Sequence, residues 1–538
     1  MNNFDFIIIG AGSAGCVLAD KLSASGEYQV CLLEAGPKDS HWSIHMPLGV
    51  IELMRDKVRN WQYHSSPEIS QNNREIFNPR GKTLGGSSSI NAMLYTRGQK
   101  EDYDHWRDLG NKGWGFDDVL PYFKRTQHQE RGECEFHGIN GPLNVADSRA
   151  KPPVHDDFML SAQQAGFPLN DDFNGDSQEG IGYYQMTQIN GQRCSAAKAF
   201  LTPNLGRSNL TVITGAHVQN ILIDKNKKAT GVCYKANGKK QNIFAKKEVL
   251  LSAGAFNSPQ ILMLSGIGPK EELMKHNIPL KHELSGVGEN LQDHPDTIVV
   301  THHNRTDIFA LRPKSIWWTA KQALKYFSTD KKLRSGIFTS AVAESGGFIK
   351  SKPNLSRPDI QLHFIPAAFD DHGRNFKMLM NYGISVHACL LRPKSRGSVT
   401  LYGGEPSLHP KITLNMLQDE DDQKDMIQAV KIARSILAQP PLSDHNGKEI
   451  FPGEETQSDE EILEFLKNKT NTIYHPVGTC KMGSDDLAVV DSELKVHGIK
   501  SLRVIDASIM PTLISGNTNA PTIMIAAKIA DNILAQHA

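Results

Sequence analysis

Short apolar runs that end in small or acidic residues divide the chain into predicted strand–turn–helix units. The first run, 4–9, leads into a glycine turn, after which 16–22 continues with helical spacing, and a second run ends at Glu34. The runs at 248–255 and 502–507 are likewise short, apolar and end in small residues. A segment with helical spacing, 258–264, follows the first of these two runs. Such runs are typical of buried parallel strands. We therefore predict one α/β sheet assembled from the beginning, middle and end of the chain.

A different pattern lies between these runs. Residues 359–364, 383–391 and 397–401 alternate or run apolar as antiparallel strands do, and 394–397 reads as a tight connection between two of them. Near the C-terminus, 522–534 has helical spacing, with Pro521 suited to the first helical position. These features predict a second domain over roughly 306–462, joined by part of 150–200, which would cover a substrate.

Length and charge narrow the class of protein. The chain has 538 residues, enough for two or three domains, and equal numbers of basic and acidic residues, 59 each, argue against a nucleic-acid partner. Seven scattered cysteines without a CxxC pair suit reduced thiols in the cytoplasm and offer no metal or disulfide framework. Because the first strand begins at Phe4, we expect no signal peptide.

A tryptophan-containing stretch bears on membrane contact. No apolar run approaches the ~20 residues that span a bilayer. Residues 315–320, which include Trp317 and Trp318, form a candidate surface element, although core aromatics are the favoured interpretation. Peripheral contact with a membrane therefore stays open.

The glycine-rich turn after the first run carries the best-defined chemistry. Gly10 permits a tight turn, Gly12 lets the backbone approach a pyrophosphate, and Gly15 lets the helix pack closely on the strand. The helix N-terminus favours phosphate charge, and Glu34 can accept hydrogen bonds from ribose hydroxyls. The turn in this context predicts a bound dinucleotide; a glycine-rich turn without a ligand is the alternative.

Three further stretches add candidate chemistry. Residues 78–93 contain adjacent glycines followed by three serines, a loop that can wrap phosphates and the edge of a flat heterocycle. Pro476 restricts His475 to extended backbone, and a histidine with an ordinary pKa of about 6.5 exchanges protons near neutrality. Asn519 lies close to a helix start, which favours negative charge. Taken alone, each stretch also fits a purely structural role.

Together, in this order and at these separations, the four patches resemble the glucose–methanol–choline (GMC) oxidoreductases, which use FAD. The resemblance covers most of the chain and is carried by GAGSAG…EAG, GKTLGGSSSIN, GAFNSPQILMLSGIGP, HPVGTCKMG and LRVIDASIMP…GNTNAPTIMIAAKIAD. It implies a mixed α/β fold, in which a Rossmann-like FAD-binding domain accompanies a discontinuous substrate domain built on an antiparallel sheet flanked by helices. The FAD-binding domain would comprise 1–155, 196–305 and 463–538, and the substrate domain 156–195 and 306–462.

The resemblance also assigns site residues by motif. The ADP half of FAD would be held by Gly10, Gly12, Ser13, Ala14, Gly15, Glu34 and Ala35. The flavin and its pyrophosphate would be lined by Gly86, Ser87, Asn91, Ala92, Met93 and Leu94, with further cofactor contacts from Trp61, Val218, Asp506 and Ala507. For Trp61, a core tryptophan is the competing interpretation. Some members bind FAD covalently through a histidine just before the asparagine of the GGSSSIN loop; Ile90 stands there, so we expect noncovalent FAD.

His475 and Asn519 match the catalytic pair of the family, which implies oxidation of an alcohol: His475 would take the hydroxyl proton, Asn519 would hold the oxygen, and hydride would pass to the flavin. We favour a primary aliphatic or aromatic alcohol over choline as the substrate. Glu344 and Tyr474 are candidate substrate contacts, since a carboxylate and an aromatic ring could bind the ammonium group of choline. A quinone acceptor, which would imply the inner face of a membrane, is expected. An oxygen-using oxidase, an FAD-containing hydroxynitrile lyase and a non-catalytic flavoprotein are the rival interpretations. The sequence does not indicate an oligomeric state.

Overall fold

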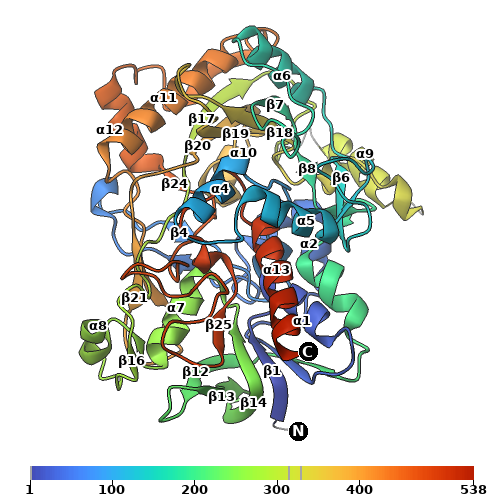
Figure 1. Cartoon of the computed structure of the whole chain (residues 1–538). Coiled ribbons are helices and arrows are strands. Elements are labelled where there is room, and N and C mark those ends of the chain that lie inside the picture. Colours follow the sequence, from blue (N-terminus) through green and yellow to red (C-terminus); the bar gives the residue numbers. More distant parts are fainter. Residues whose placement is uncertain (1–2, 313–315, 328–329) are drawn as a thin grey trace.

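The protein is represented by a computed structural model that describes residues 3–312, 316–327 and 330–538. Two large sheets organise it: a mainly parallel sheet in the lower half of Figure 1 and an antiparallel sheet in the upper half. The chain ends near its beginning, since the ring of His537 lies 5.6 Å from that of Phe6, centroid to centroid (Figure 1). Among the described residues, no helix combines the length and apolarity needed to cross a lipid bilayer.

The first sheet combines segments from three distant parts of the chain. Its strand order is β11-β2-β1-β14-β13-β12, and β25 also pairs with β14. The pairs β11–β2, β2–β1, β1–β14 and β14–β25 are parallel, whereas β12, β13 and β14 form an antiparallel meander. The strands are β1 (Asn3–Ile9), β2 (Val30–Glu34), β11 (Leu210–Thr214), β12 (His217–Ile223), β13 (Ala229–Ala236), β14 (Lys239–Leu251) and β25 (Leu502–Val504). The predicted composite sheet is confirmed.

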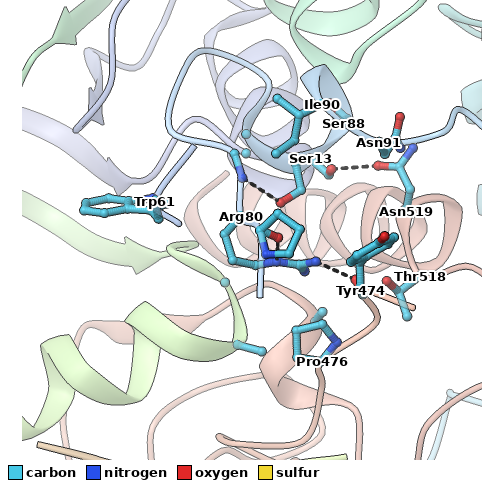
Figure 2. Close-up of a pocket in the computed structure, with 18 of the residues that line it drawn as sticks. Ser13, Trp61, Arg80, Ser88, Ile90, Asn91, Tyr474, Pro476, Thr518 and Asn519 are labelled. Carbon is cyan, nitrogen blue, oxygen red and sulfur yellow. Dashed lines mark hydrogen bonds between the residues drawn. The ribbon is translucent and has the colours of Figure 1, made fainter. Parts of the chain in front are cut away.

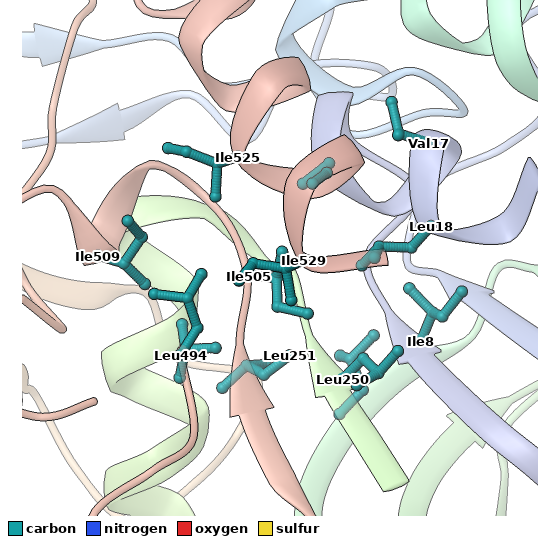
Figure 3. Packing of buried hydrophobic residues seen from close by; sticks show 14 of the residues in the cluster. Ile8, Val17, Leu18, Leu250, Leu251, Leu494, Ile505, Ile509, Ile525 and Ile529 are labelled. Atoms are coloured by element: carbon teal, nitrogen blue, oxygen red, sulfur yellow. The ribbon is translucent and has the colours of Figure 1, made fainter. Parts of the chain in front are cut away.

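Two helices from opposite ends of the chain cover this sheet. Helices α1 (Ser13–Ser23) and α13 (Asn519–His537) lie side by side and pack together (Figure 1). Ile8 of β1 and Leu250 of β14 meet Leu18 of α1 and Ile529 of α13 in one buried cluster (Figure 3). Because covered parallel strands bury both faces, their sequences are continuous apolar runs rather than alternating ones. This core fixes the glycine turn next to the start of α13.

Two helix starts differ from the predictions. Helix α7 (Gly254–Leu264) begins before the predicted start at 258, since Asp506 accepts hydrogen bonds from the Gly254 N–H (2.8 Å) and the Ser258 hydroxyl (2.6 Å). Helix α13 begins at Asn519, so Pro521 is its third residue rather than its first. Proline is tolerated there because the first N–H groups of a helix have no partner within the helix.

The second sheet is antiparallel, in the order β23-β17-β20-β19-β18-β7, with β24 paired to β17. Its strands are β7 (Gly180–Tyr183), β17 (Pro295–His303), β18 (Ser345–Ile349), β19 (Ile360–Ile365), β20 (Gly383–Leu390), β23 (Asn446–Phe451) and β24 (Asn471–Thr472). Leu362 and Phe364 join one buried cluster with residues of α6 (Val154–Gln164) and α11 (Glu420–Leu437). The alternate residues His363 and Ile365 line a cavity, as the period of two in a strand requires.

Part of the predicted second-domain pattern lies elsewhere. The segment predicted at 397–401 forms β21 (Ser398–Leu401), which pairs only with β22 (Pro410–Thr413), so 394–397 does not join two strands of one sheet. Val399 and Ile412 are instead buried against Phe256 of α7. Strands β17 and β24 belong to the antiparallel sheet although both lie in stretches that the sequence assigns to the FAD-binding domain. The proposed domain boundaries stay a prediction.

The remaining long helices pack around these sheets. Helix α5 packs against α13 and α4, and α12 packs against α11 (Figure 1). Their bounds are α4 (Lys100–Asp108), α5 (Phe116–Thr126) and α12 (Asp459–Lys469).

Candidate active site

A cavity of about 310 Å³ extends from the carboxyl ends of β1 and β2 to the inner face of the antiparallel sheet (Figure 2). Residues at the carboxyl ends of parallel strands lie where α/β sheets bind ligands. All the predicted site residues except Gly15 and Glu344 line this cavity. They are Gly10, Gly12, Ser13, Ala14, Glu34, Ala35, Trp61, Gly86, Ser87, Asn91, Ala92, Met93, Leu94, Val218, Tyr474, His475, Asp506, Ala507 and Asn519.

The glycine turn forms one end of the cavity. A Cβ at Gly10, whose φ is +95°, would lie 2.5 Å from the Ser252 carbonyl oxygen, whereas a Cβ at Gly12 would meet nothing within 4 Å. Gly15 packs directly against the turn, since a Cβ at this position would lie 1.9 Å from the carbonyl oxygen of Gly10. The turn is therefore closed by Gly10 and Gly15 and leaves open space at Gly12.

Glu34 lies on the rim of this end. Its carboxylate accepts hydrogen bonds from the backbone N–H groups of Ala11 (3.0 Å) and Gly36 (2.8 Å), and burial raises its pKa to about 7. Carboxylate oxygens have more acceptor positions than these two bonds use. Trp61 lies nearby, stacked on Tyr63 at 5.6 Å between ring centroids.

The second glycine loop touches the first. A Cβ at Gly86, whose φ is +53°, would lie 2.7 Å from the Cα of Gly12. Asn91 is fixed by the buried Arg193, whose Nη1 donates to Asn91 Oδ1 at 2.6 Å. Ile90, the residue at the position of the covalent histidine in some GMC members, lines the cavity (Figure 2). Both predicted glycine loops thus contribute to one continuous wall.

The hydrogen bonds of His475 define which of its nitrogens is basic. His294 Nε2 lies 3.1 Å from the Ile514 carbonyl oxygen, which can only accept, so this nitrogen carries a proton. In neutral His294, Nδ1 is then the acceptor, and His475 Nδ1, 3.0 Å away, is its donor. The unprotonated nitrogen of neutral His475 is therefore Nε2, which accepts a hydrogen bond from Asn517 Nδ2 at 3.0 Å.

Burial keeps both imidazoles neutral. It lowers the pKa of His294 to about 3 and, together with the neighbouring His294, lowers the pKa of His475 well below its ordinary value. The ordinary pKa expected from the sequence is therefore wrong for His475, because a buried imidazolium loses its hydration. At neutral pH the ring is a free base.

The backbone around His475 is also fixed. Its N–H donates to Asp293 Oδ1 at 2.8 Å. The preceding Tyr474 has a φ of +75°, a conformation that side chains other than glycine rarely adopt, and its carbonyl accepts from Arg80 Nη2 at 2.7 Å (Figure 2). These contacts hold the imidazole in a single position relative to the cavity.

The asparagine beside His475 is Asn517, and the expected pairing with Asn519 is not what the structure shows. Asn517 Oδ1 accepts from Thr96 (3.1 Å) and Gln361 (3.2 Å), which turns its Nδ2 toward the histidine. Asn519 Oδ1 instead accepts from the Ser13 hydroxyl at 2.7 Å, beside the first glycine turn (Figure 2). Asn519 is the first residue of α13, whereas Asn517 precedes the helix, and the two side chains point to different partners.

Three histidines that sequence reasoning missed line the opposite end of the cavity. His363, His372 and His387 each have one buried ring nitrogen without a hydrogen-bond partner among the described residues: Nδ1, Nε2 and Nε2, respectively. His387 Nδ1 is held by Asp296 at 2.7 Å. The sequence signal for His363 and His387 was a polar residue inside an apolar strand. The three imidazole rings therefore line the cavity, while these nitrogens themselves are buried.

The two substrate candidates have different positions. Tyr474 lines the cavity, and its hydroxyl lies 2.5 Å from His372 Nδ1. Glu344 is buried away from the cavity, where its Oε1 accepts from the Ser340 hydroxyl (2.5 Å) and the Ala341 N–H (2.7 Å). The candidate contact of Glu344 with a substrate is therefore wrong.

Comparisons with known proteins assign the chain to a family. Two sequence models described as GMC oxidoreductase match residues 4–296 and 393–526. The chain is 46% identical to the alcohol dehydrogenase [acceptor] of Pseudomonas putida, over 99% of this chain and 96% of that protein. It is 43% identical to the mitochondrial choline dehydrogenase of Homo sapiens, over 100% of this chain and 91% of that protein.

Solved structures give the same assignment. The pyridoxine 4-oxidase of Mesorbium loti superposes with a TM-score of 0.87 at 28% identity, over 98% of each chain. A variant of the formate oxidase of Aspergillus oryzae superposes with a TM-score of 0.90 at 28% identity, over 100% of this chain and 99% of that one. With both glycine loops and His475 on one cavity wall, and with matches over most of its length, the chain belongs to the GMC oxidoreductase family.

Proposed function

We propose that the protein oxidises a primary aliphatic or aromatic alcohol to the aldehyde with noncovalently bound FAD and passes the electrons to a quinone. The observation that carries this proposal is the basic nitrogen of His475, Nε2, which lies 3.0 Å from the amide Nδ2 of Asn517 in the cavity wall. Deprotonation of an alcohol requires a base that accepts the hydroxyl proton and, next to it, a hydrogen-bond donor that holds the oxygen.

The cavity wall fits FAD, which the family implies. Gly12 and Gly86 bring two loops into contact with no side chain between them, and the first turn of α1 follows directly. The dinucleotide would be held there, with Glu34 and Val218 at its adenosine end. Asp506 and Ala507 also line the cavity. When bound, FAD supplies the acceptor for the hydride that leaves the carbinol carbon.

The residues of this chain would act on the substrate hydroxyl. An alcohol oxygen that displaces the hydrogen bond between His475 and Asn517 would donate its proton to Nε2 and accept a hydrogen bond from Nδ2. His294 fixes the tautomer that makes Nε2 the base, and Asp293 and Arg80 hold the backbone on either side of the Tyr474–His475 bond. The alcohol loses one proton to His475 and one hydride, and the product is the carbonyl compound.

The charge of the cavity supports a neutral alcohol over choline. Among the described residues, the only carboxylates that line the cavity are Glu34 and Asp506, which belong to the dinucleotide-binding end. A quaternary ammonium group is recognised by aromatic faces and a nearby carboxylate. Choline remains the second candidate because the choline dehydrogenases are similar at 41–43% identity.

Anaerobic mixing tests the proposed substrate class. The purified yellow protein is mixed with a medium-chain alcohol, benzyl alcohol or choline while flavin absorbance is followed. Bleaching by the neutral alcohols supports the proposal, and bleaching by choline alone contradicts it. If none of many alcohols bleaches the flavin, a lyase that binds FAD without net oxidation is favoured. Peroxide release at the rate of turnover in air would replace the quinone by oxygen as the acceptor.

Noncovalent attachment gives a separate prediction. Ile90 offers only a hydrocarbon side chain at the position where some family members attach FAD through histidine. After acid precipitation of the holoenzyme, we expect the yellow colour to stay in the supernatant. A yellow protein pellet would contradict this, and a covalently flavinylated protein treated in parallel provides the control.

The pH dependence of flavin reduction should follow the lowered pKa of His475. The neutral imidazole is the active form, and a lowered pKa means that protonation removes it only at acidic pH. The limiting rate of anaerobic reduction by a saturating alcohol should therefore show no decline as pH falls through the ordinary value of 6.5. A half-maximal rate near that value would show that His475 titrates as an exposed histidine does.

A further inference from the structure

An amphipathic segment outside the reaction machinery is exposed to a degree unusual for this chain. Helix α9 (Ile316–Tyr326) protrudes from the side of the molecule (Figure 1). Trp317, Leu324, Phe327 and Leu333 are 80%, 76%, 69% and 67% exposed, and among the described large hydrophobic side chains only Ile69 exceeds Trp317. The expectation of core aromatics is wrong for Trp317, whereas Trp318 is half-buried and residue 315 lies outside the described residues.

Basic side chains accompany these apolar ones. Lys321 and Lys325 on α9, and Lys331 and Lys332 on the 3₁₀ turn η7 (Lys331–Leu333), are exposed. No ion pair within the described part of the chain involves any of the four ammonium groups. Asp330 is the one acidic residue at 316–334, in a chain with no net charge. The α9 patch is defined here as Trp317, Lys321, Leu324, Lys325, Phe327, Lys331, Lys332 and Leu333.

The α9 patch adjoins the cavity wall. Helix α9 packs against the 3₁₀ turn η8 (Ile337–Thr339), and the chain continues from there into Ala341, Val342 and Ala343, which line the cavity. Turn η8 also packs against the 3₁₀ turn η1 (Pro47–Gly49), and the residues that directly follow η1 in the chain line the cavity. A surface bound at the α9 patch would therefore lie near the chain segments that form the cavity.

We propose that the α9 patch docks the protein on a membrane surface that carries anionic lipids. Tryptophan, leucine and phenylalanine side chains partition into the headgroup–acyl boundary, and lysines beside them are attracted to anionic headgroups. A second copy of the chain is the poorer occupant, because a two-fold interface through this patch would bring its unpaired lysines together. The proposal goes beyond the proposed reaction and does not depend on which alcohol is oxidised.

Vesicle sedimentation of the holoenzyme tests the proposal. We expect binding to vesicles of phosphatidylcholine mixed with phosphatidylglycerol, weaker binding to phosphatidylcholine alone, and loss of the difference at high salt. The variant Trp317→Glu/Leu324→Glu should abolish binding. Neutralising a lysine near an anionic surface costs about fivefold in partitioning, so Lys331→Gln/Lys332→Gln should weaken binding roughly 25-fold.

A matched control is Met274→Glu on α8 (Lys270–Lys275), which is 64% exposed and lies on the opposite side of the molecule in Figure 1. It should bind vesicles as the unmodified protein does. None of the substituted residues lines the cavity, so dye-coupled turnover of a dissolved alcohol should stay unchanged in every variant and reports correct folding.

Several outcomes would overturn the proposal. One is that the unmodified holoenzyme fails to bind anionic vesicles, and another is that the Trp317→Glu/Leu324→Glu variant binds them as well as the unmodified protein does. If a substitution in the patch changes only the oligomeric state, the patch contacts a second copy of the chain. Sedimentation needs no turnover, so a protein that binds vesicles but is not reduced by any alcohol would contradict the proposed function and leave this inference standing.

Discussion

Replacing His475 by alanine is expected to slow anaerobic flavin reduction by roughly 10²–10⁴-fold, the range that a positioned general base contributes. The physical reason is that His475 Nε2 is the acceptor of the substrate proton in the proposed reaction, and this nitrogen is unprotonated because His294 fixes the tautomer. The measurement is the limiting rate of flavin bleaching in single-turnover mixing with a saturating alcohol.

The control for His475→Ala is the cofactor itself. The hydrogen bonds of His475 go to His294, Asp293 and Asn517 and not to the glycine turn, so the variant should purify yellow with an unchanged ratio of FAD to protein. A colourless variant would mean that the slower rate reports lost cofactor rather than lost chemistry. Reduction at the original rate by a fully loaded variant would remove His475 from the mechanism.

Replacing Asn517 by alanine is expected to lower the rate of reduction by about 10²–10³-fold, as loss of one preorganised donor to a reacting oxygen does. The matched variant Asn519→Ala should retain most of the rate, because Asn519 is engaged by Ser13 and not by His475. Loss of the hydrogen bond between Ser13 and Asn519 should lower the free energy of unfolding by about 1 kcal/mol. The two single-turnover rates, measured on preparations with equal FAD content, decide between the asparagines.

A third variant separates the donor from the packing role of Asn517. Asn517→Asp keeps the acceptors that face Thr96 and Gln361 but replaces the Nδ2 donor with a carboxylate oxygen. A negative charge beside His475 favours the imidazolium and should raise its pKa, so the pH profile of reduction should shift toward higher pH. A variant that keeps both the rate and the profile of the unmodified protein would show that Asn517 only packs.

The glycine turn and His475 were predictable because their signals are local. Gly10 and Gly15 are required by backbone atoms that lie within the same strand–turn–helix unit or on the neighbouring strand, and a local requirement leaves a short motif. His475 was predicted from the HPVGTCKMG motif that carries the family resemblance, because the proline that follows it also fits a structural role. The composite sheet was also predictable from the sequence, since buried parallel strands have continuous apolar runs.

The partners of His475 were not predictable from local signals. Asn517 and Asn519 stand two positions apart at the beginning of α13, one before the helix and one in its first position, and nothing in their spacing says which amide meets a histidine some forty residues earlier in the chain. Glu344 had the right chemistry for a cation but folds onto its own loop. Side-chain direction at such positions follows from packing between distant segments.

The sequence by itself predicted the parallel sheet and the glycine turn, which rest on requirements within a short segment. It also predicted the family and His475 as the candidate base, which rest on the motifs that carry the resemblance. Only the tertiary structure decided that Asn517 accompanies His475, that His294 makes Nε2 the basic nitrogen, and that burial lowers the pKa of His475. These properties depend on distances between residues far apart in the chain and on the exclusion of water, which exist only once the two sheets have packed around the cavity.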